Sequence, residues 1–385
     1  MSLFDQVAKA RANGGKPAWQ QLSEAVRLRL ARPPLGIGEY FDYGIWHASI
    51  TPERMREFIG WRQSAALDKQ LNADYSRVLA NDKLLNYLVL QAAGYRIPTP
   101  IATYTRNGRS IGNERVLQTI EAVRSFLDEA PYPFYVKPIS AGYGRGVLGV
   151  AGLDGQRLHL MDDSQIEVDD FLAPFAFAPY QGMLFQQPLV AHPAIAALTA
   201  SQAICCVRFI CFVTAAGPVI HTAFWKIIAG RNMLDNFSHG DYGNCLAAID
   251  IDTGQVVRAI SHLGPGGQID RHPGTQKLLP GFPLPDWEKS LALVHSAARH
   301  FPGLRLQNWD VALCPEGPVL LELNTESELA IPQAISGRGL VDQRLRDILA
   351  ELEQEDRACR QALTRGPPKP LRISPPEPGI TLKSL

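Results

Sequence analysis

The sequence predicts a mixed α+β protein in which a helical N-terminal region precedes two or three lobes. The chain has 385 residues. This length exceeds what a single hydrophobic core supports, because such cores stop growing at roughly 250 to 300 residues. Apolar residues recur at helical spacing through residues 1–80, whereas the pattern from about residue 203 is largely one of apolar strands. Helices followed by strands predict the α+β class.

The composition excludes several kinds of protein. Lys plus Arg and Asp plus Glu each number 38, so no global charge favours nucleic acid or a disordered chain. No stretch approaches the roughly 18 apolar residues of a membrane span, and the N-terminus lacks an apolar signal core. We therefore expect a cytoplasmic protein without a membrane span or nucleic acid. The six cysteines lack paired spacing and are expected to be mostly buried and reduced.

The N-terminal helices follow from periodicity and end signals. Residues 17–34 have helical spacing and stop at a double proline, and 51–63 begin with a threonine N-cap. Residues 76–94 predict one further helix, with Gly94 placed for a left-handed C-cap.

The pattern changes after Gly94. We expect helices over 114–130, about 164–173 and 286–301, and strands over 97–105, 133–140, 182–190, 203–214, 217–228 and 245–260. A hairpin over 308–324 closes the folded part, and the proline content of 366–385 predicts an extended or disordered tail.

A glycine loop follows the strand at 133–140. Residues 144–149 match G-x-G-x-x-G, but the loop lies between two strands, whereas a dinucleotide fingerprint opens a helix. No G-K-[ST] follows, and no kinase H-R-D or D-F-G is present. Such a hairpin can still cover phosphates with backbone N–H groups. A mobile surface hairpin is the alternative.

Three cationic side chains lie in otherwise apolar strands, namely Lys137, Arg208 and Lys226. A charge in such a strand is costly unless an anion compensates it, so together they predict a site for a polyanion. Lys83 is a fourth candidate, although a solvent-exposed helical lysine is an equally ordinary interpretation.

Gln186 and Gln187 end an apolar strand before a proline, and Leu189 follows. This segment could present backbone groups to an adenine edge while Leu189 packs on the ring. The alternative is that the two amides only cap the strand.

The hairpin at 308–324 carries three oxygen ligands among apolar residues. Glu322 and Asn324 alternate along one strand and therefore share a face, and Asp310 on the partner strand can face them. Two carboxylates and an amide oxygen suit magnesium, which takes its remaining ligands from water and phosphates. The alternative is that these groups form ion pairs or cap the strand.

Taken in order, these segments resemble the ATP-grasp superfamily. The resemblance rests on 81–100, on YVKPISAGYGRG at 135–146, on FQQPLV at 185–190, and on Asp310 followed by Glu322-x-Asn324. GEYFDYGIW, LNADYSRVLANDK, DNFSHGDYGN, DRHPGTQKL and NWDVAL further resemble the sugar-transfer associated ATP-grasp group, which is related to α-L-glutamate ligases.

The resemblance implies an ATP-grasp fold of two α+β lobes that grip ATP. It implies a helical region over 1–80, an ATP-grasp domain over 81–335 with a lid lobe at 97–188 and a metal-binding lobe at 189–335, and a helix and proline-rich tail over 336–385.

The resemblance also implies roles for individual residues. It places ATP against Lys83, Lys137, Gly142, Gly144, Gly146, Gln186, Gln187, Leu189 and His192, and two Mg²⁺ ions on Asp310, Glu322 and Asn324. Arg208 and Lys226 would hold the triphosphate or an acyl-phosphate. Asn236, Arg271 and His272 are candidates for substrate contact, with an ordinary loop histidine as the alternative for His272.

Asn308 marks a departure, because D-alanine–D-alanine ligases have an arginine two residues before the first metal aspartate. If that arginine neutralises an oxyanion, another residue must do so in this chain, where Asn308 occupies its position. The candidates are Arg208, Lys226 and Arg271.

The activity implied is an ATP-dependent carboxylate–amine ligase working through an acyl-phosphate, in polysaccharide or natural-product biosynthesis. A phosphotransferase and a non-catalytic nucleotide-binding scaffold are the alternatives. The partners would be a small carboxylate and an amine or similar acceptor, and the sequence does not indicate the oligomeric state.

Overall fold

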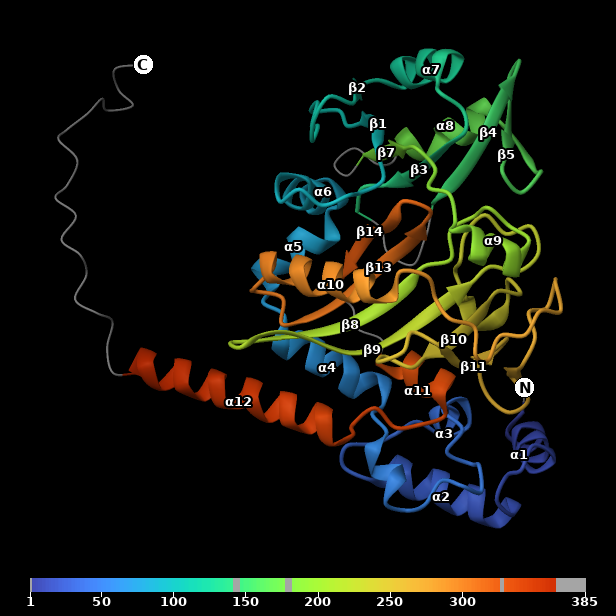
Figure 1. Ribbon diagram of the computed structural model, residues 1–385, viewed down its shortest axis with the longest axis vertical. Coiled ribbons are helices and arrows are strands. Elements are labelled where there is room, and N and C mark those ends of the chain that lie inside the picture. Colours follow the sequence, from blue (N-terminus) through green and yellow to red (C-terminus); the bar gives the residue numbers. More distant parts are fainter. Residues whose placement is uncertain (1, 141–145, 177–181, 326–328, 365–385) are drawn as a thin grey trace.

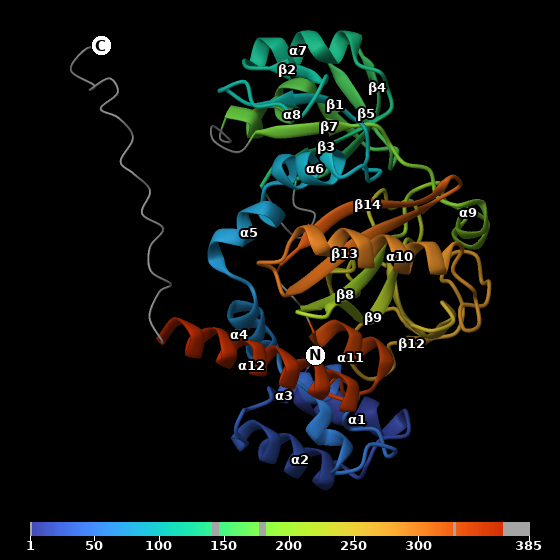
Figure 2. The same cartoon turned by 60° about the vertical axis from the view of Figure 1, so that its left-hand side comes forward.

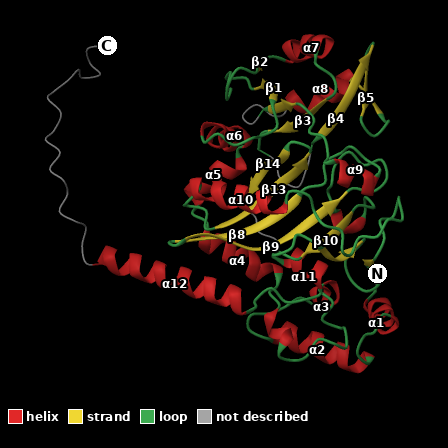
Figure 3. Cartoon of the chain, in the orientation of Figure 1, coloured by secondary structure: helices red, strands yellow, loops and turns green. Residues whose placement is uncertain are grey.

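The computed structural model describes residues 2–140, 146–176, 182–325 and 329–364. Within these ranges the strands form two seven-stranded sheets, with the first above the second in Figure 1 and the N-terminal helices at the lower end. Figure 3 shows that helices flank both groups of strands, as expected for an α+β chain.

The N-terminal helices surround a small aromatic core. Tyr40, Phe41, Ile45 and Trp46 are buried in it, and Ala334 from near the C-terminal end of the chain joins the same cluster. This region thus packs against a segment far away in the sequence. Its helices are α1 (Leu3–Ala12), α2 (Ala18–Leu30), α3 (Ile37–Asp42), the 3₁₀ turn η1 (Arg54–Glu57) and α4 (Trp61–Leu71).

Residues 51–63 do not form the single predicted helix. After η1 the chain is extended, and α4 begins only at Trp61. Gln333 holds the intervening backbone, because its Oε1 accepts from Ile59 N at 2.9 Å and its Nε2 donates to Ile59 O at 2.8 Å. A distant side chain therefore overrides the local helix signal.

The helix predicted over 76–94 is broken at Asp82. The structure has α5 (Asp74–Asn81) and α6 (Lys83–Ala92). The Asp82 carboxylate accepts from Leu84 N at 3.0 Å and Leu85 N at 3.1 Å, so it caps α6 and starts a new helix axis.

The first sheet has the strand order β2-β1-β7-β3-β4-β5-β6. Its strands are β1 (Pro100–Tyr104), β2 (Arg115–Leu117), β3 (Phe134–Pro138), β4 (Leu148–Asp154), β5 (Arg157–Leu160), β6 (Gln165–Glu167) and β7 (Met183–Gln186), with helices α7 (Ile120–Glu129) and α8 (Val168–Ala176).

Two predicted helices in this lobe start later than expected. The first turn of 114–130 forms β2, parallel to β1, and α7 begins after Thr119, whose hydroxyl caps Ala122 N. The start of 164–173 pairs as β6 with β5 before α8 begins. In both cases sheet pairing satisfies backbone groups that a helix would have used.

The second sheet has the order β12-β11-β10-β9-β8-β13-β14. Its strands are β8 (Val207–Thr214), β9 (Gly217–Ile227), β10 (Cys245–Ile249), β11 (Val256–Ile260), β12 (Gln268–Ile269), β13 (Leu306–Cys314) and β14 (Gly317–Asn324). The accompanying helices are α9 (Pro193–Thr199), η2 (Ser238–Gly240), α10 (Trp287–Ala297), η3 (Ala298–His300), α11 (Ala330–Ser336) and α12 (Gln343–Thr364).

The cysteines follow the sequence expectation except for one. Five are buried, whereas Cys359 is exposed on α12, the long helix that leads away from the body in Figure 1. Burial raises the pKa of the Cys205 and Cys211 thiols to about 12, which keeps both as neutral packing groups at ordinary pH.

Candidate functional site

A cavity of about 180 Å³ lies where the two sheets meet. Figure 2 shows α6 at this junction, above β14 and beside the first sheet. The lining combines apolar residues with four cations and three carboxylates. It consists of Lys83, Tyr135, Lys137, Pro138, Val147, Gln186, Leu189, Ile204, Cys206, Arg208, Lys226, Met233, Leu234, Asp235, Asn236, Asp310, Leu321, Glu322 and Asn324.

The upper wall of the cavity carries two buried lysines. Lys137 Nζ donates to the Tyr87 hydroxyl at 3.0 Å, and within the described part of the chain it forms no ion pair. Burial lowers the pKa of Lys137 below its usual value. Lys83 Nζ lies 3.0 Å from Glu322 Oε1, and burial also lowers its pKa, with Glu322 opposing the shift. Lys83 is thus compensated by Glu322, whereas Lys137 has a hydroxyl group as its partner.

Tyr87 connects the two lobes at this wall. Its hydroxyl accepts from Lys137 on β3 and lies 3.1 Å from Leu321 O on β14, to which it donates. Tyr87 is fully buried. Its two hydrogen bonds therefore link the ammonium group of Lys137 to the backbone of the second sheet.

The lower wall is an ion-pair network centred on Asp310. Arg208 donates to it through Nε at 2.7 Å and Nη2 at 2.6 Å, and Lys226 Nζ lies 3.2 Å from both Asp310 and Asp235. The register explains the first contact, since Asp310 on β13 is directly opposite Arg208 on β8. A bidentate arginine–carboxylate ion pair of this kind is strong and directional.

Protonation in this network is set by the neighbouring charges. Burial alone would raise the pKa of Asp310, but Arg208 and Lys226 outweigh it and hold the pKa at about 2. Burial alone would lower the pKa of Lys226, but Asp235 and Asp310 outweigh it and raise the pKa above its usual value. All three side chains are therefore charged at neutral pH.

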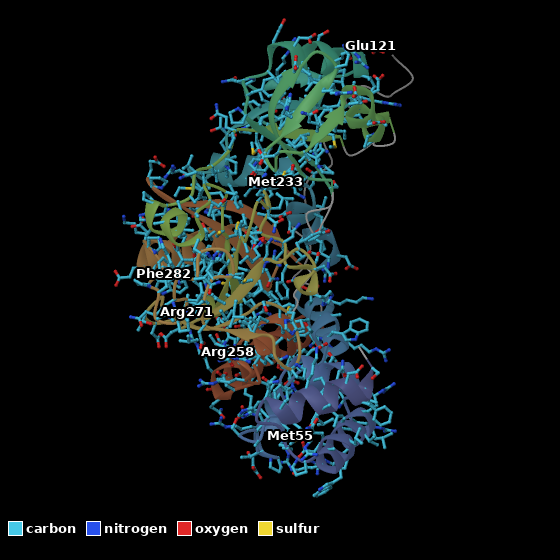
Figure 4. All side chains as sticks on the ribbon, turned by 90° about the vertical axis from the view of Figure 1, so that its right-hand side faces the viewer. Met55, Glu121, Met233, Arg258, Arg271 and Phe282 are labelled. Carbon is cyan, nitrogen blue, oxygen red and sulfur yellow. The ribbon has the colours of Figure 1, made fainter. Side chains whose placement is uncertain are left out.

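The segment 232–244 closes one side of the cavity. Asp235 accepts from Cys206 N at 2.7 Å, and the buried Asn244 amide donates to Leu234 O and Asn236 O at 2.8 Å each. Figure 4 shows Met233 where the upper lobe meets the lower one. Tyr135 donates to Met233 O at 3.0 Å, so this segment also contacts the first sheet.

The structure brings most of the predicted nucleotide residues together, but not all of them. Lys83, Lys137, Gln186 and Leu189 line the cavity. Gln187 pairs through its backbone N–H with Thr99 O, and His192 caps α9 by accepting from Ala194 N, so neither lines it. Their nucleotide contacts remain predictions.

Of the predicted loop glycines, Gly142 and Gly144 lie outside the described residues. Gly146 has φ of 72°, in the left-handed region, and a Cβ there would lie 3.0 Å from Pro138 Cγ. Glycine therefore suits this position at the cavity edge, beside Val147.

The predicted metal ligands share one surface. Asp310 is directly opposite Glu322 across the β13–β14 pair, and both line the cavity with Asn324. Asn324 Nδ2 is buried without a hydrogen-bond partner among the described residues. Within the same ranges no three His, Cys, Asp or Glu side chains cluster as a metal site. Two carboxylates and an amide leave positions that phosphate and water would fill, which fits magnesium.

Three other predicted residues do not line the cavity. Asn308 is buried and donates to Asn324 O at 3.3 Å. His272 is fully buried, with Nε2 2.8 Å from Ile228 O and Nδ1 accepting from Thr275 N. Arg271 donates to Gln276 O and lies well below Met233 in Figure 4. Their roles in the reaction remain predictions, whereas Asn236 does reach the cavity.

Sequence reasoning missed Tyr87, Tyr135 and Met233. Each belongs to an apolar or irregular segment without a local polar pattern, and each acts through a contact across the lobes. The one available signal was a tyrosine four residues after Lys83 on the predicted helix, which places both on one face.

A cavity lined by cations and carboxylates between two α+β lobes is suited to binding a polyanion. Residues 62–349 match the family described as "Sugar-transfer associated ATP-grasp", so the chain belongs to this family and has the ATP-grasp fold.

Solved structures offer more distant likenesses. The D-Ala:D-Ser ligase VanG from Enterococcus faecalis is 13% identical with a TM-score of 0.39, and the match covers 72% of this chain and 64% of the ligase. The ATP-grasp ligase PsnB is 16% identical with a TM-score of 0.33, covering 73% and 63%. A biotin carboxylase from Campylobacter jejuni is 14% identical with a TM-score of 0.38, covering 70% and 46%. No curated protein matches the sequence, and no described helix is long and apolar enough to cross a membrane.

Proposed function

We propose that the protein is an ATP-dependent carboxylate–amine ligase that works through an acyl-phosphate. The observation that supports this best is the meeting of four cations, two buried and two partly buried, with the Asp310–Glu322 pair in one cavity between the lobes. Among the described residues Lys137 has a tyrosine hydroxyl and no carboxylate as its partner, and the phosphates of a magnesium-bound nucleotide would supply the missing negative charge.

The nucleotide would lie with its base toward the apolar side of the cavity. Leu189, Leu321 and Met233 offer packing surface there, and the end of β7 at Gln186 offers polar groups. Lys83 and Lys137 would then contact phosphate oxygens, because they are the cations on the upper wall. We also propose the boundaries 1–80, 81–335 and 336–385 for the functional parts of the chain.

Asp310, Glu322 and Asn324 would hold magnesium. When bound, the ion supplies charge neutralisation between the phosphates and an incoming carboxylate. Asp310 and Glu322 are now tied to Arg208 and Lys83. Metal binding at the carboxylates would free these two cations to contact phosphate.

The reaction would proceed in two displacements. A substrate carboxylate oxygen attacks the γ-phosphorus, the bond to the β–γ bridging oxygen breaks, and ADP leaves. The amine then attacks the acyl carbon, phosphate leaves, and the nitrogen loses a proton. Arg208 and Lys226 would hold the transferred phosphoryl group and offset the repulsion between anions. Asn308 carries no charge and cannot replace the missing arginine, so stabilisation of the oxyanion would depend on these two cations.

The test is product analysis with ATP, Mg²⁺ and a panel of amino acids and sugar acids, with hydroxylamine as the trapping amine. A ligase yields ADP, free phosphate and a hydroxamate in equal amounts. Glu322→Ala with Asn324→Ala should abolish turnover while the fold persists by circular dichroism. A stable phosphorylated product without free phosphate would instead establish a phosphotransferase, and nucleotide binding without turnover on any panel would establish a scaffold.

A further inference from the structure

Helix α2 presents four of its apolar side chains to solvent. Trp19 is 72% exposed, Val26 51% and Leu30 77%, and Leu22 is also exposed. On an ideal helix these four positions lie within about 80° of one another, so they form one stripe. We call these four residues the α2 stripe. A continuous stripe of this kind is unusual on a soluble surface and indicates an interaction site.

The opposite face of α2 is buried and largely polar. Glu24 accepts from Lys16 Nζ at 2.9 Å and from the Tyr40 hydroxyl at 2.8 Å, and Gln21 Nε2 donates to Lys16 O at 2.7 Å. This network fixes the rotation of the helix about its axis, because turning it would bury Trp19 and expose the charge pair. The outward direction of the α2 stripe is therefore built into the fold.

The charge around the α2 stripe is basic. Residues 1–36 contain six Lys or Arg and two Asp or Glu, a net charge of +4, and since the chain is balanced the remainder carries −4. Glu24 and Lys16 are buried, so the exposed charges are five basic groups and Asp5. By helical geometry Arg27 and Arg29 flank the α2 stripe on its two sides.

We propose that the α2 stripe docks the protein on the surface of an anionic lipid bilayer. Aromatic and aliphatic side chains on one helix face, with arginines at its edges, are the features of helices that lie in a membrane interface. The four apolar side chains would enter the headgroup region while the arginines contact lipid phosphates. Figures 1 and 2 place α2 at the lower end of the molecule, so docking leaves the cavity at the sheet junction accessible.

The features favour a bilayer over a second protein copy. The α2 stripe is the outer ridge of a helix, and the exposed charges on α2 are exclusively basic. Two copies meeting along this ridge would bring Arg27 and Arg29 against the same arginines, since a two-fold interface is self-complementary. An anionic surface instead attracts these charges.

The experiment is sedimentation of the full chain with vesicles of phosphatidylcholine alone or mixed with phosphatidylglycerol, without nucleotide. We expect binding to the anionic vesicles, weakened by salt, and none to the neutral ones. Trp19→Ser with Leu30→Ser should weaken it at least tenfold. Arg27→Gln with Arg29→Gln should weaken it about 25-fold, at roughly fivefold per arginine near the surface.

Matched controls are Val257→Ser with Leu278→Ser, which remove similarly exposed apolar groups elsewhere, and Arg346→Gln with Arg360→Gln on α12. Neither pair should change binding. Absence of binding to anionic vesicles, or binding unchanged in the α2 variants, overturns the proposal. So does a dimer in sedimentation velocity that Trp19→Ser with Leu30→Ser dissociates. Because no nucleotide is present, the outcome is independent of the proposed ligase activity.

Discussion

The two walls of the cavity use buried charge in opposite ways. On the lower wall two cations and two carboxylates neutralise one another within hydrogen-bonding distance, namely Arg208, Lys226, Asp235 and Asp310. On the upper wall Lys137 has a tyrosine hydroxyl as its partner and a lowered pKa. The charges of the lower wall are balanced within that wall, whereas the upper wall contains an ammonium group, that of Lys137, without a carboxylate partner among the described residues.

The difference indicates what each wall contributes to binding. A buried ammonium without a carboxylate is costly in the empty protein, so an anion that reaches Lys137 recovers that cost. The lower wall must instead exchange partners, because Asp310 cannot serve a metal ion and Arg208 equally well at once. We therefore expect the lower wall to dominate stability and the upper wall to dominate nucleotide affinity.

The largest effect is expected for Asp310→Asn. The change removes the carboxylate that Arg208 and Lys226 share, although Lys226 keeps Asp235, and should lower the free energy of unfolding by about 3 to 5 kcal/mol. Urea unfolding of the nucleotide-free protein measures it.

The matching control is the double variant Asp310→Asn with Arg208→Met. It removes both members of the pair and should recover part of the loss, because no full charge then lacks its partner. If the loss of unfolding free energy in the double variant equals the sum of the losses in the two single variants, Arg208 and Asp310 are not coupled. That result would contradict the charge balance proposed for the lower wall.

For the upper wall we expect the reverse from Lys137→Met. Removing a buried ammonium without a carboxylate partner should leave the nucleotide-free protein as stable as before or more stable. The affinity for Mg-ATP should fall about 10- to 100-fold, the size of a charge-assisted hydrogen bond to phosphate. Calorimetric titration and thermal unfolding give the two readings. Lys289→Met, at an exposed lysine on α10, should change neither, and a strongly destabilised Lys137→Met would contradict the comparison.

The sequence predicted the cations of both walls but only part of their connections. Lys137, Arg208 and Lys226 were recognisable because each is a lone charge in an apolar strand. The Arg208–Asp310 pair depends on the register of β8 against β13, which are about a hundred residues apart and joined by no local signal. The role of Tyr87 was not predictable from the sequence for the same reason, because its hydrogen-bond partners lie on β3 and β14. The breaks at Ile59 and Asp82 likewise follow from contacts or caps that helical periodicity conceals.

The acid limb of stability should report the lower wall. Asp310 has a pKa of about 2 in the folded protein against 3.8 for a free side chain. Its folded pKa is depressed, so its contribution is fully present above about pH 4 and is lost as the pH falls toward 2, by roughly 2 kcal/mol. Unfolding free energies across this range should fall less steeply in Asp310→Asn. Asp170→Asn, at an exposed carboxylate on α8, should keep the wild-type slope; equal slopes in all three proteins would contradict the assignment.

The smallest effect is expected for Tyr87→Phe, which tests the connection between the walls. Loss of the hydroxyl removes the hydrogen bonds to Lys137 Nζ and Leu321 O, and should destabilise the nucleotide-free protein by about 1 to 2 kcal/mol. Saturating Mg-ATP should reduce this deficit, because phosphate gives Lys137 a new partner. Tyr132→Phe, whose hydroxyl donates to Leu127 O within one lobe at 2.7 Å, should show a similar loss that nucleotide does not reduce. If ATP leaves both deficits equal, Lys137 does not exchange the tyrosine for phosphate, and the stored charge of the upper wall serves another anion.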